Sequence, residues 1–374
     1  MKKLTIDIEY LQTTLSELLA IPSPTGYTDD VVHYTCGQLK KLGLNYELTR
    51  RGAIRGTIKG KTESPDRAIV AHLDTLGAMV KNLKPNGRLS LSPLGSWSPR
   101  FAEGCRVKII SNNGLYSGTI IPLLASGHTY NDLIDTQPVS WENLELRIDE
   151  KVNSKEDLVH LGIDVGDFIA VDPQPHFSSN GFINSRHLDD KAGVAILLSA
   201  MKAIKESNIV LPVDCHPLFT ISEEEGSGAS SILHQDVAAM VAIDNATIAK
   251  HQNSHEFGVT ICMKDSSGPY DYHLTKNLVE LCKNNDISYS KDIFRFYKSD
   301  AASAIESGSD IRTALVCFAL DSSHGYERTH LDSLVSVAQL LTLYMQEPVS
   351  YRREEKPLND VGDFPHPNIK PFEQ

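Results

Sequence analysis

Apolar and polar positions alternate with the period of an α-helix over the first 42 residues of the chain. One apolar stripe stops before Pro22 and Pro24, so we predict a first helix there. The stripe consists of Ile8, Leu11, Leu15, Leu18 and Leu19. A second helix is predicted from about residue 28 to residue 42. Its expected inner face consists of Val31, Val32, Tyr34, Leu39 and Leu42.

The apolar pattern then changes to that of β-strands. We predict strands in NYELTR (45–50), AIRGTIKG (53–60) and RAIVAHLD (67–74), where apolar and β-branched residues gather between turn residues. The third segment carries an apolar triplet directly into His72. Because open α/β sheets bind ligands at the carboxyl ends of their strands, His72 is a candidate ligand.

A segment of different character interrupts this pattern at residues 77–174. It is rich in Gly, Pro, Ser and Asn and contains short alternating runs. These runs are RVKII, YSGTI, LELRI and DFIAV. Helical and strand patterns then alternate again, with helices in GVAILLSAMKAIKES and LVSVAQLLTLYMQE and strands in HPLFTIS and AAMVAID. We therefore predict one α/β catalytic domain, residues 1–76 and 175–350, interrupted by a β-rich insertion at 77–174. The polar, proline-rich residues 351–374 are predicted to form an extended tail.

Composition excludes several classes of protein. The chain has 374 residues, of which 41% are apolar, and this is enough for a sizeable core. Its net charge of -12 and the lack of a Lys/Arg-rich run argue against nucleic-acid binding. The six cysteines are scattered without a CxxC pair, so we expect buried thiols. No signal-peptide pattern or apolar stretch of membrane length is present, and a cytoplasmic protein that binds no membrane is expected.

Residue types that bind divalent metals end five short segments far apart in the chain. They are His72 and Asp74 in AHLDTLG, Asp189 and Asp190 in HLDDKAG, Glu223 and Glu224 in SEEEGSG, Asp244 in AIDNA, and His324 in SSHGYE. Two histidines, two aspartates and one glutamate can hold a pair of metal ions if one carboxylate bridges them, which leaves a further glutamate to move protons. Asp74 is suited to orient the other ring nitrogen of His72.

Each of these segments has a plainer interpretation when taken alone. Asp189 and Asp190 could cap a helix, and the run of three glutamates could lie in a solvated loop. His324 and His330 compete for the last ligand position, because the spacing of SSHGYERTH allows only one of them into a common site. The joint occurrence of all five segments favours the metal site.

The ordered set of motifs resembles the cocatalytic aminopeptidases of peptidase family M forty-two, which include the tetrahedral and glutamyl aminopeptidases. The resemblance runs through IPSPTGYTDDV, AHLDTLG, HLDDKAG, EEEGSGA, AIDNA, SGPYDYHLTKNL, SDAASAIESGSD and SSHGYE, and covers roughly residues 8 to 345. More narrowly, the chain resembles the branch named for the osmoprotectant N-acetylglutaminylglutamine amide system. The resemblance implies a zinc-peptidase-like α/β/α sandwich with an inserted barrel-like or PDZ-like domain.

The resemblance also implies a role for each site residue. His72 and Asp244 would hold one metal ion, Glu224 and His324 the other, and Asp189 would bridge both. Glu223 would be the general base and acid, and Asp74 would orient His72. The Asp189–Asp190 peptide is cis in related enzymes. Asp300, in SDAASA, would lie near the substrate.

Three segments depart from the family pattern. EEEGSGA replaces the usual EEVGLRGA, so the glutamate pair could be Glu224 and Glu225, although the spacing to Gly226 favours Glu223 and Glu224. Lys191 replaces an arginine after the double aspartate, and HGYE replaces HSPxE. These changes leave the metal ligands in place and bear on the substrate.

The predicted function is hydrolysis of N-terminal residues from short peptides, through a hydroxide that bridges two divalent ions, with zinc first and cobalt second as candidates. An amidohydrolase acting on an N-acyl dipeptide amide or a similar osmolyte is the alternative, and an inactive assembly protein is a lesser one. By resemblance, the insertion would mediate assembly of a homo-oligomer, from dimer to dodecamer.

Overall fold

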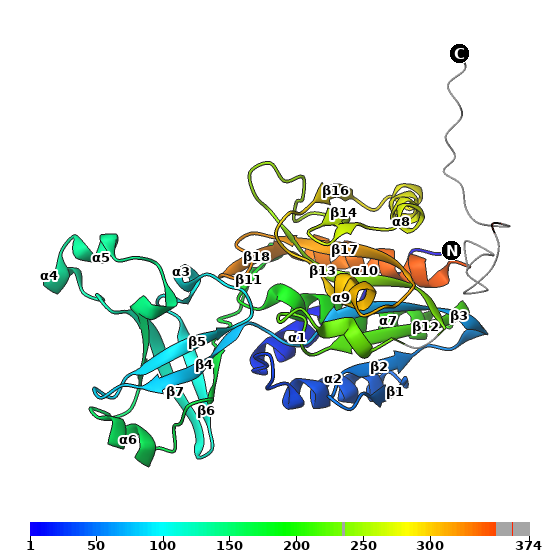
Figure 1. Ribbon diagram of the computed structural model, residues 1–374. Coiled ribbons are helices and arrows are strands. Elements are labelled where there is room, and N and C mark those ends of the chain that lie inside the picture. Colours follow the sequence, from blue (N-terminus) through cyan, green and yellow to red (C-terminus); the bar gives the residue numbers. More distant parts are fainter. Residues whose placement is uncertain (234–235, 349–360, 362–374) are drawn as a thin grey trace.

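The structure is a computed structural model that describes residues 1–233, 236–348 and 361. It has two parts, a large sheet with packed helices and a smaller barrel at one end (Figure 1). The predicted α/β fold with a β-rich insertion is therefore confirmed. The predicted tail, residues 351–374, lies outside the described residues apart from Val361.

The large sheet has nine strands in the order β1-β2-β12-β3-β13-β17-β14-β15, with β16 paired to β14. Their bounds are β1 Asn45–Leu48, β2 Ile54–Thr57, β3 Gly60–His72, β12 Leu211–Thr220, β13 Val237–Thr247, β14 Val259–Asp265, β15 Gly268–Pro269, β16 Tyr289–Ile293 and β17 Arg312–Leu320. The central four strands, β12, β3, β13 and β17, are mutually parallel. Their carboxyl ends therefore meet at one edge of the sheet.

Helices pack on this sheet and bury their apolar faces in one core. Their bounds are α1 Ile8–Ala20, α2 Asp29–Lys41, α7 Leu188–Ser207, α8 Tyr272–Asn284, α9 Asp300–Glu306 and α10 Leu331–Gln346. The long helix α7 contacts β3 and β13, and α1 and α10 pack against α7. None of the helices in the described part of the chain is long and apolar enough to cross a membrane.

The first helix differs from its prediction at one position. Asp7 caps α1 by accepting a hydrogen bond from the backbone N–H of Tyr10, at 3.0 Å. Leu11, Leu15, Leu18 and Leu19 are buried as predicted, but Ile8 is 46% exposed. Leu4 and Ile6, ahead of α1, are the buried apolar residues at this end of the chain.

The smaller part is a closed barrel with its own hydrophobic core. Its strands pair in the order β4-β5-β8-β7-β6-β9. Their bounds are β4 Gly77–Leu83, β5 Leu89–Leu94, β6 Arg106–Ser111, β7 Gly114–Pro122, β8 Leu144–Ile148 and β9 Phe168–Val171. Short helices α3 Pro99–Ala102, α4 Gly127–Tyr130, α5 Leu133–Thr136 and α6 Lys155–His160 fill its connections. We propose that residues 77–174 are the inserted domain, and that 1–76 with 175–350 form the catalytic domain.

A separate sheet has three strands, β10 (His176–Phe177) and β11 (Phe182–Ser185), which follow the barrel in sequence, and β18 (Glu327–His330), which comes after β17. All six cysteines are buried free thiols, as expected from the sequence.

Candidate active site

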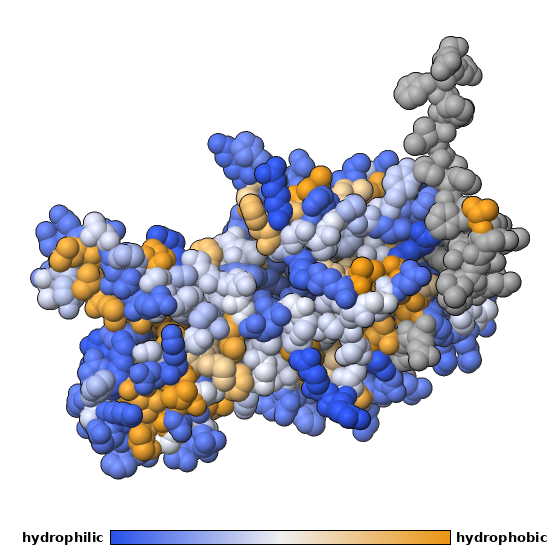
Figure 2. Space-filling model, viewed as in Figure 1, coloured by the Kyte–Doolittle hydropathy of each residue, from blue (hydrophilic) through white to orange (hydrophobic). Residues whose placement is uncertain are grey.

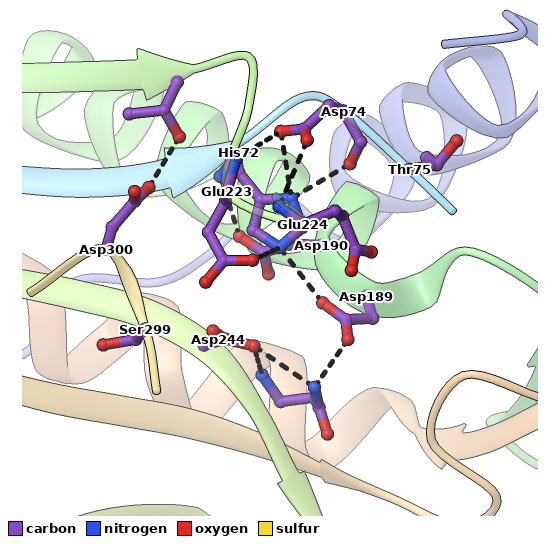
Figure 3. A network of polar contacts seen from close by, with 12 residues as sticks. His72, Asp74, Thr75, Asp189, Asp190, Glu223, Glu224, Asp244, Ser299 and Asp300 are labelled. Carbon is purple, nitrogen blue, oxygen red and sulfur yellow. Dashed lines mark hydrogen bonds and ion pairs between the residues drawn. The ribbon is translucent and has the colours of Figure 1, made fainter. Parts of the chain in front are cut away.

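The carboxyl edge of the parallel strands brings four of the five predicted ligands into one cluster, namely His72, Asp189, Glu224 and Asp244 (Figure 3). His72 ends β3, Asp244 lies near the end of β13, and Glu223 and Glu224 follow β12. Asp189 lies in the first turn of α7, and its peptide bond to Asp190 is cis, as the resemblance implies.

His72 turns one ring nitrogen toward the cluster. Its Nε2 lies 3.1 Å from Asp189 Oδ1 and 3.8 Å from Glu223 Oε2. Its Nδ1 lies 2.9 Å from the backbone carbonyl oxygen of Asp74 and 3.6 Å from the Asp74 carboxylate. A proton on Nδ1 can therefore be donated to the carbonyl, which leaves Nε2 free to bind a metal ion.

The Asp74 carboxylate holds the turn that carries the glutamates. It accepts hydrogen bonds from Thr25 Oγ1 at 2.7 Å and from the backbone N–H groups of Glu223 and Glu224, at 3.1 and 3.2 Å. The sequence predicts that this carboxylate orients His72, but the closer partner of the ring is the backbone carbonyl oxygen of Asp74. Asp74 is therefore placed to position three site residues at once, and Thr25 is a partner that the sequence analysis missed.

The three consecutive glutamates point in different directions. Glu223 faces His72, and Glu224 Oε2 lies 3.8 Å from His324 Nε2. Glu225 turns away and accepts a hydrogen bond from the backbone N–H of Gly95, at 2.7 Å. The geometry supports Glu223 and Glu224 as the functional pair.

Of the two competing histidines, His324 joins the cluster. Its Nε2 lies 3.3 Å from Asp189 Oδ2, and its Nδ1 lies 2.8 Å from the backbone carbonyl oxygen of Ser96. A loop of the barrel region thus orients this ring. His330 instead bonds through Nε2 to the Asn180 carbonyl and packs against the ring of Phe182.

Asp189 lies between the two histidines. Its Oδ1 contacts His72 and its Oδ2 contacts His324. Asn245 also donates to Oδ2 through Nδ2, at 2.7 Å. One carboxylate oxygen directed at each histidine is the arrangement that a bridging ligand requires.

Two further side chains of the site were missed by the sequence analysis. Asn245 bonds to both Asp189 and Asp244. Glu327 accepts hydrogen bonds from the backbone N–H groups of His324 and Asp189, at 3.0 and 3.2 Å. Asn245 belongs to the motif AIDNA and Glu327 to SSHGYE. The only indication of their role in the sequence was that each shares a motif with a candidate ligand.

Asp300 is buried outside the cluster. Its Oδ2 accepts a hydrogen bond from Thr220 Oγ1, at 2.6 Å. Thr220 ends β12, just before the turn with the glutamates, so this hydrogen bond ties Asp300 to that strand end. Figure 3 shows Asp300 to one side of the cluster.

The buried carboxylates carry more negative charge than the surrounding protein neutralises. Burial raises the pKa of Glu223 and of Glu224 well above the ordinary value. Burial and the charge of Asp189 raise the pKa of Asp244 to about 7. Burial opposes ionisation of Asp189 as well, but hydrogen bonds from His324 and His72 lower its pKa. A bound cation would relieve this repulsion.

The donor set fits a divalent metal. Ligand atoms of His72, Asp189 and Glu224 all lie within 4.8 Å of one another. Glu224 Oε1 is buried and has no hydrogen-bond partner. Buried carboxylate oxygens are normally satisfied, so a cation is the natural partner for this atom, and mixed imidazole and carboxylate donors suit zinc and similar ions.

We expect the metal-free protein to lose stability as pH rises from 5.5 to 7.5. Burial raises the pKa of Asp300 to about 6, of Asp244 to about 7 and of Glu327 to about 8. The folded state thus holds protons that the unfolded state releases, so ionisation above pH 5.5 favours unfolding. Burial lowers the pKa of Lys191 to about 7, so this group acts in the opposite direction from about pH 7 upward, and the comparison therefore stops at pH 7.5.

Thermal unfolding of chelated protein at the two pH values measures this effect. We expect a Tm lower by at least about 2 °C at pH 7.5, with zinc restoring more stability at pH 7.5 than at pH 5.5. A higher Tm at pH 7.5 in chelator would show that the carboxylates do not repel one another as described.

The cluster opens into a cavity of about 820 Å³. Asp189, Glu223, Glu224, Asp244 and His324 line it. Ser96, Trp97 and Phe101 of the barrel region also line it, together with residues of the loops after β13 and β16. A volume of this size accommodates a small organic ligand or a short peptide.

The chain is similar to known aminopeptidases along most of its length. The family described as "M42 glutamyl aminopeptidase" matches residues 52–340. The putative aminopeptidase YhfE of Bacillus subtilis is 41% identical over 337 residues, covering 90% of this chain and 97% of that protein. The glutamyl aminopeptidase of Lactococcus lactis is 27% identical over 213 residues, covering 56% of this chain and 58% of that protein.

Solved structures share the fold at lower sequence identity. A TET aminopeptidase from a marine sediment archaeon superimposes with a TM-score of 0.83 at 18% identity, covering 91% of this chain and 96% of that one. The TET1 peptidase of Pyrococcus horikoshii, described as assembling into a tetrahedron or an octahedral shell, gives a TM-score of 0.79 at 22% identity, covering 90% and 99% of the two chains.

Proposed function

We propose that this protein, which belongs to the M42 glutamyl aminopeptidase family, uses two metal ions to remove N-terminal residues from short peptides. Membership makes it a metal-dependent hydrolase of the aminopeptidase class. The observation that carries the two-metal proposal is the placement of Asp189, with one carboxylate oxygen toward each of two histidines.

Five residues would hold the ions. His72 and Asp244 would bind one, Glu224 and His324 the other, and Asp189 both. The contacts that support this assignment are those of Asp189 with each histidine and of Glu224 with His324. Zinc is the first candidate and cobalt the second.

Two divalent ions, when bound, acidify water and polarise a carbonyl group. Glu223 then moves the proton: its Oε2 lies beside the His72 ring and faces the cavity. It takes the proton of the attacking water and passes it to the departing amine nitrogen. One carboxylate can serve both steps, because the group must first accept a proton and then release it.

Other residues keep these groups in position. Asp74 and Thr25 fix the backbone of the glutamate turn, Glu327 fixes the backbone of Asp189 and His324, and the Ser96 carbonyl orients the His324 ring. Because Ser96 belongs to the region between the barrel strands, the proposed inserted domain supports the chemistry directly.

The assembly is proposed by analogy. A related solved structure is described as a dodecamer, and another as a tetrahedron or octahedral shell. We propose a homo-oligomer, from dimer to dodecamer, that acts on short peptides and binds neither nucleic acid nor membrane.

A panel of substrates separates this function from its alternatives. We expect zinc- or cobalt-loaded protein to cleave aminoacyl anilides and peptides with a free N-terminal amine, and to leave N-acetylated dipeptide amides intact. Cleavage of the blocked amides alone would instead indicate an amidohydrolase linked to the osmoprotectant, and no cleavage of any substrate by metal-loaded protein would indicate an inactive assembly protein.

A further inference from the structure

We infer that Lys250 and Arg295, at the mouth of the active-site cavity, bind the C-terminal carboxylate of a short peptide. The enzyme would therefore prefer short peptides with a free carboxylate over the same peptides ending in an amide. This inference rests on the proposed aminopeptidase function and adds a recognition site at the far end of the substrate.

Charges of both signs line the cavity. Five of the lining residues are acidic, and four of these belong to the proposed metal site or act as its base: Asp189, Glu223, Glu224 and Asp244, with Glu225 as the fifth. The lining also includes three cations, Lys250, Arg295 and Lys298, in a chain with 48 acidic and 36 basic residues. A group of cations in an acidic protein points to a negatively charged ligand.

Two of the three cations have no partner of their own. Lys298 is neutralised by Glu306, whose carboxylate oxygens lie 2.8 and 2.7 Å from its Nζ. Lys250 and Arg295 are exposed, and neither forms a hydrogen bond or ion pair with a residue that the structure describes. Their charges are therefore available to a ligand.

The loops that carry these cations are tied to each other. Gln252 Nε2 donates to the backbone carbonyl of Ile293, at 3.2 Å, and the backbone N–H of Asn253 donates to Asp292 Oδ2, at 2.8 Å. Both cations thus belong to one side of the cavity. This side is also anchored to the site, because Tyr297 OH donates to the backbone carbonyl of Asn245, at 2.8 Å. Anchored backbones reduce the entropy that ordering the site would cost on binding.

Phe296 extends the same surface. Its side chain is 96% exposed and lines the cavity beside Arg295. A fully exposed aromatic ring at a cavity mouth offers apolar contact to the chain of a bound peptide. The mouth therefore combines an apolar contact with two free cations, which matches the last residue of a peptide.

The exposure of the cations favours a C-terminal carboxylate over an acidic side chain on the first residue. The first residue must place its amine and carbonyl at the catalytic end, so a pocket for its side chain would lie deep and enclosed. Lys250 and Arg295 lie at the solvent side instead. A cavity of about 820 Å³ leaves room between the two ends for a peptide of a few residues.

The test compares Leu-Gly-Gly with Leu-Gly-Gly amide on the metal-loaded enzyme. Because exposed ion pairs contribute modestly, we expect kcat/KM to be about tenfold higher for the free acid, with the difference in KM. The Lys250→Gln/Arg295→Gln double variant should bring the ratio within about twofold and leave cleavage of the amide unchanged. Lys291→Gln, an exposed cation on β16 outside the cavity lining, is the matched control and should keep the wild-type ratio.

Three results would overturn the inference. The first is an equal kcat/KM for the free acid and the amide with the wild-type enzyme. The second is an equal loss of kcat/KM for both substrates in the double variant. The third is that the two cations act on the first residue instead, so that the double variant changes the preference for Glu over Gln at that position. In each of these cases the amide is still cleaved from its free N-terminus, so the proposed function stands. Failure to cleave either peptide would contradict the proposed function itself.

Discussion

Replacing Glu223 with Gln is expected to lower kcat for an aminoacyl anilide by about 10³-fold, while the protein still binds its metal ions. The amide has the shape of the carboxylate but cannot take a proton from water. Glu223 is not among the five proposed ligands, so metal content should stay at the wild-type value. Steady-state kinetics and metal analysis on the same sample measure both quantities.

Glu225→Gln is the matched control for this variant. Glu225 belongs to the same run of glutamates and also lines the cavity, but its carboxylate accepts a hydrogen bond from the Gly95 backbone and has no contact with His72 or His324 among the described ion pairs. Its replacement should leave kcat within about threefold of the wild type, because it touches none of the reacting groups. If Glu225→Gln were inactive and Glu223→Gln active, the glutamate pair would have to be reassigned to Glu224 and Glu225.

Replacing Asp189 with Asn should have the broader effect, a loss of metal and of activity together. The side-chain amide nitrogen of Asn cannot bind a cation. The variant would therefore lose the carboxylate oxygen that Asp189 directs at one of the two histidines, and with it one of the two proposed metal contacts. We expect kcat/KM to fall by more than about 10³-fold and bound metal to drop below that of the wild type. Circular dichroism of the metal-free variant checks that the fold survives.

Asp321→Asn provides the comparison for the loss of one aspartate charge. Asp321 pairs with Arg328 near the surface and does not line the cavity. It should retain full metal content and activity. An Asp189→Asn protein with unchanged metal content would show that Asp189 is not a ligand, and the two-metal proposal would then lack its central residue.

Much of the site was predictable because its residues end strands. Parallel strands place their carboxyl ends at one edge, so His72 and Asp244 meet although 171 intervening residues and the whole barrel separate them in sequence. The helices and strands of the large sheet were predictable from the spacing of apolar residues, because the buried face of a helix or strand repeats with the period of its backbone.

Details that depend on loop geometry were not predictable. The spacing of SSHGYERTH does not by itself show that the chain turns after β17 to bring His324 to Asp189 and His330 to Phe182, and only the family resemblance favoured His324. The roles of the Asp74 carboxylate and of Glu327 depend on backbone N–H groups, which have no signature in the sequence. The β character of the insertion was visible, but the closure of its strands into a barrel depends on pairing between distant strands.

The most direct test of the two-metal aminopeptidase function is the substrate panel on protein whose bound ions have been counted. We expect about two divalent ions per chain, with cleavage of free-amine substrates that disappears on chelation and returns as the ions are restored. Purified protein that cleaves these substrates with no bound metal, or that binds metal and cleaves only N-acetylated amides, would contradict it.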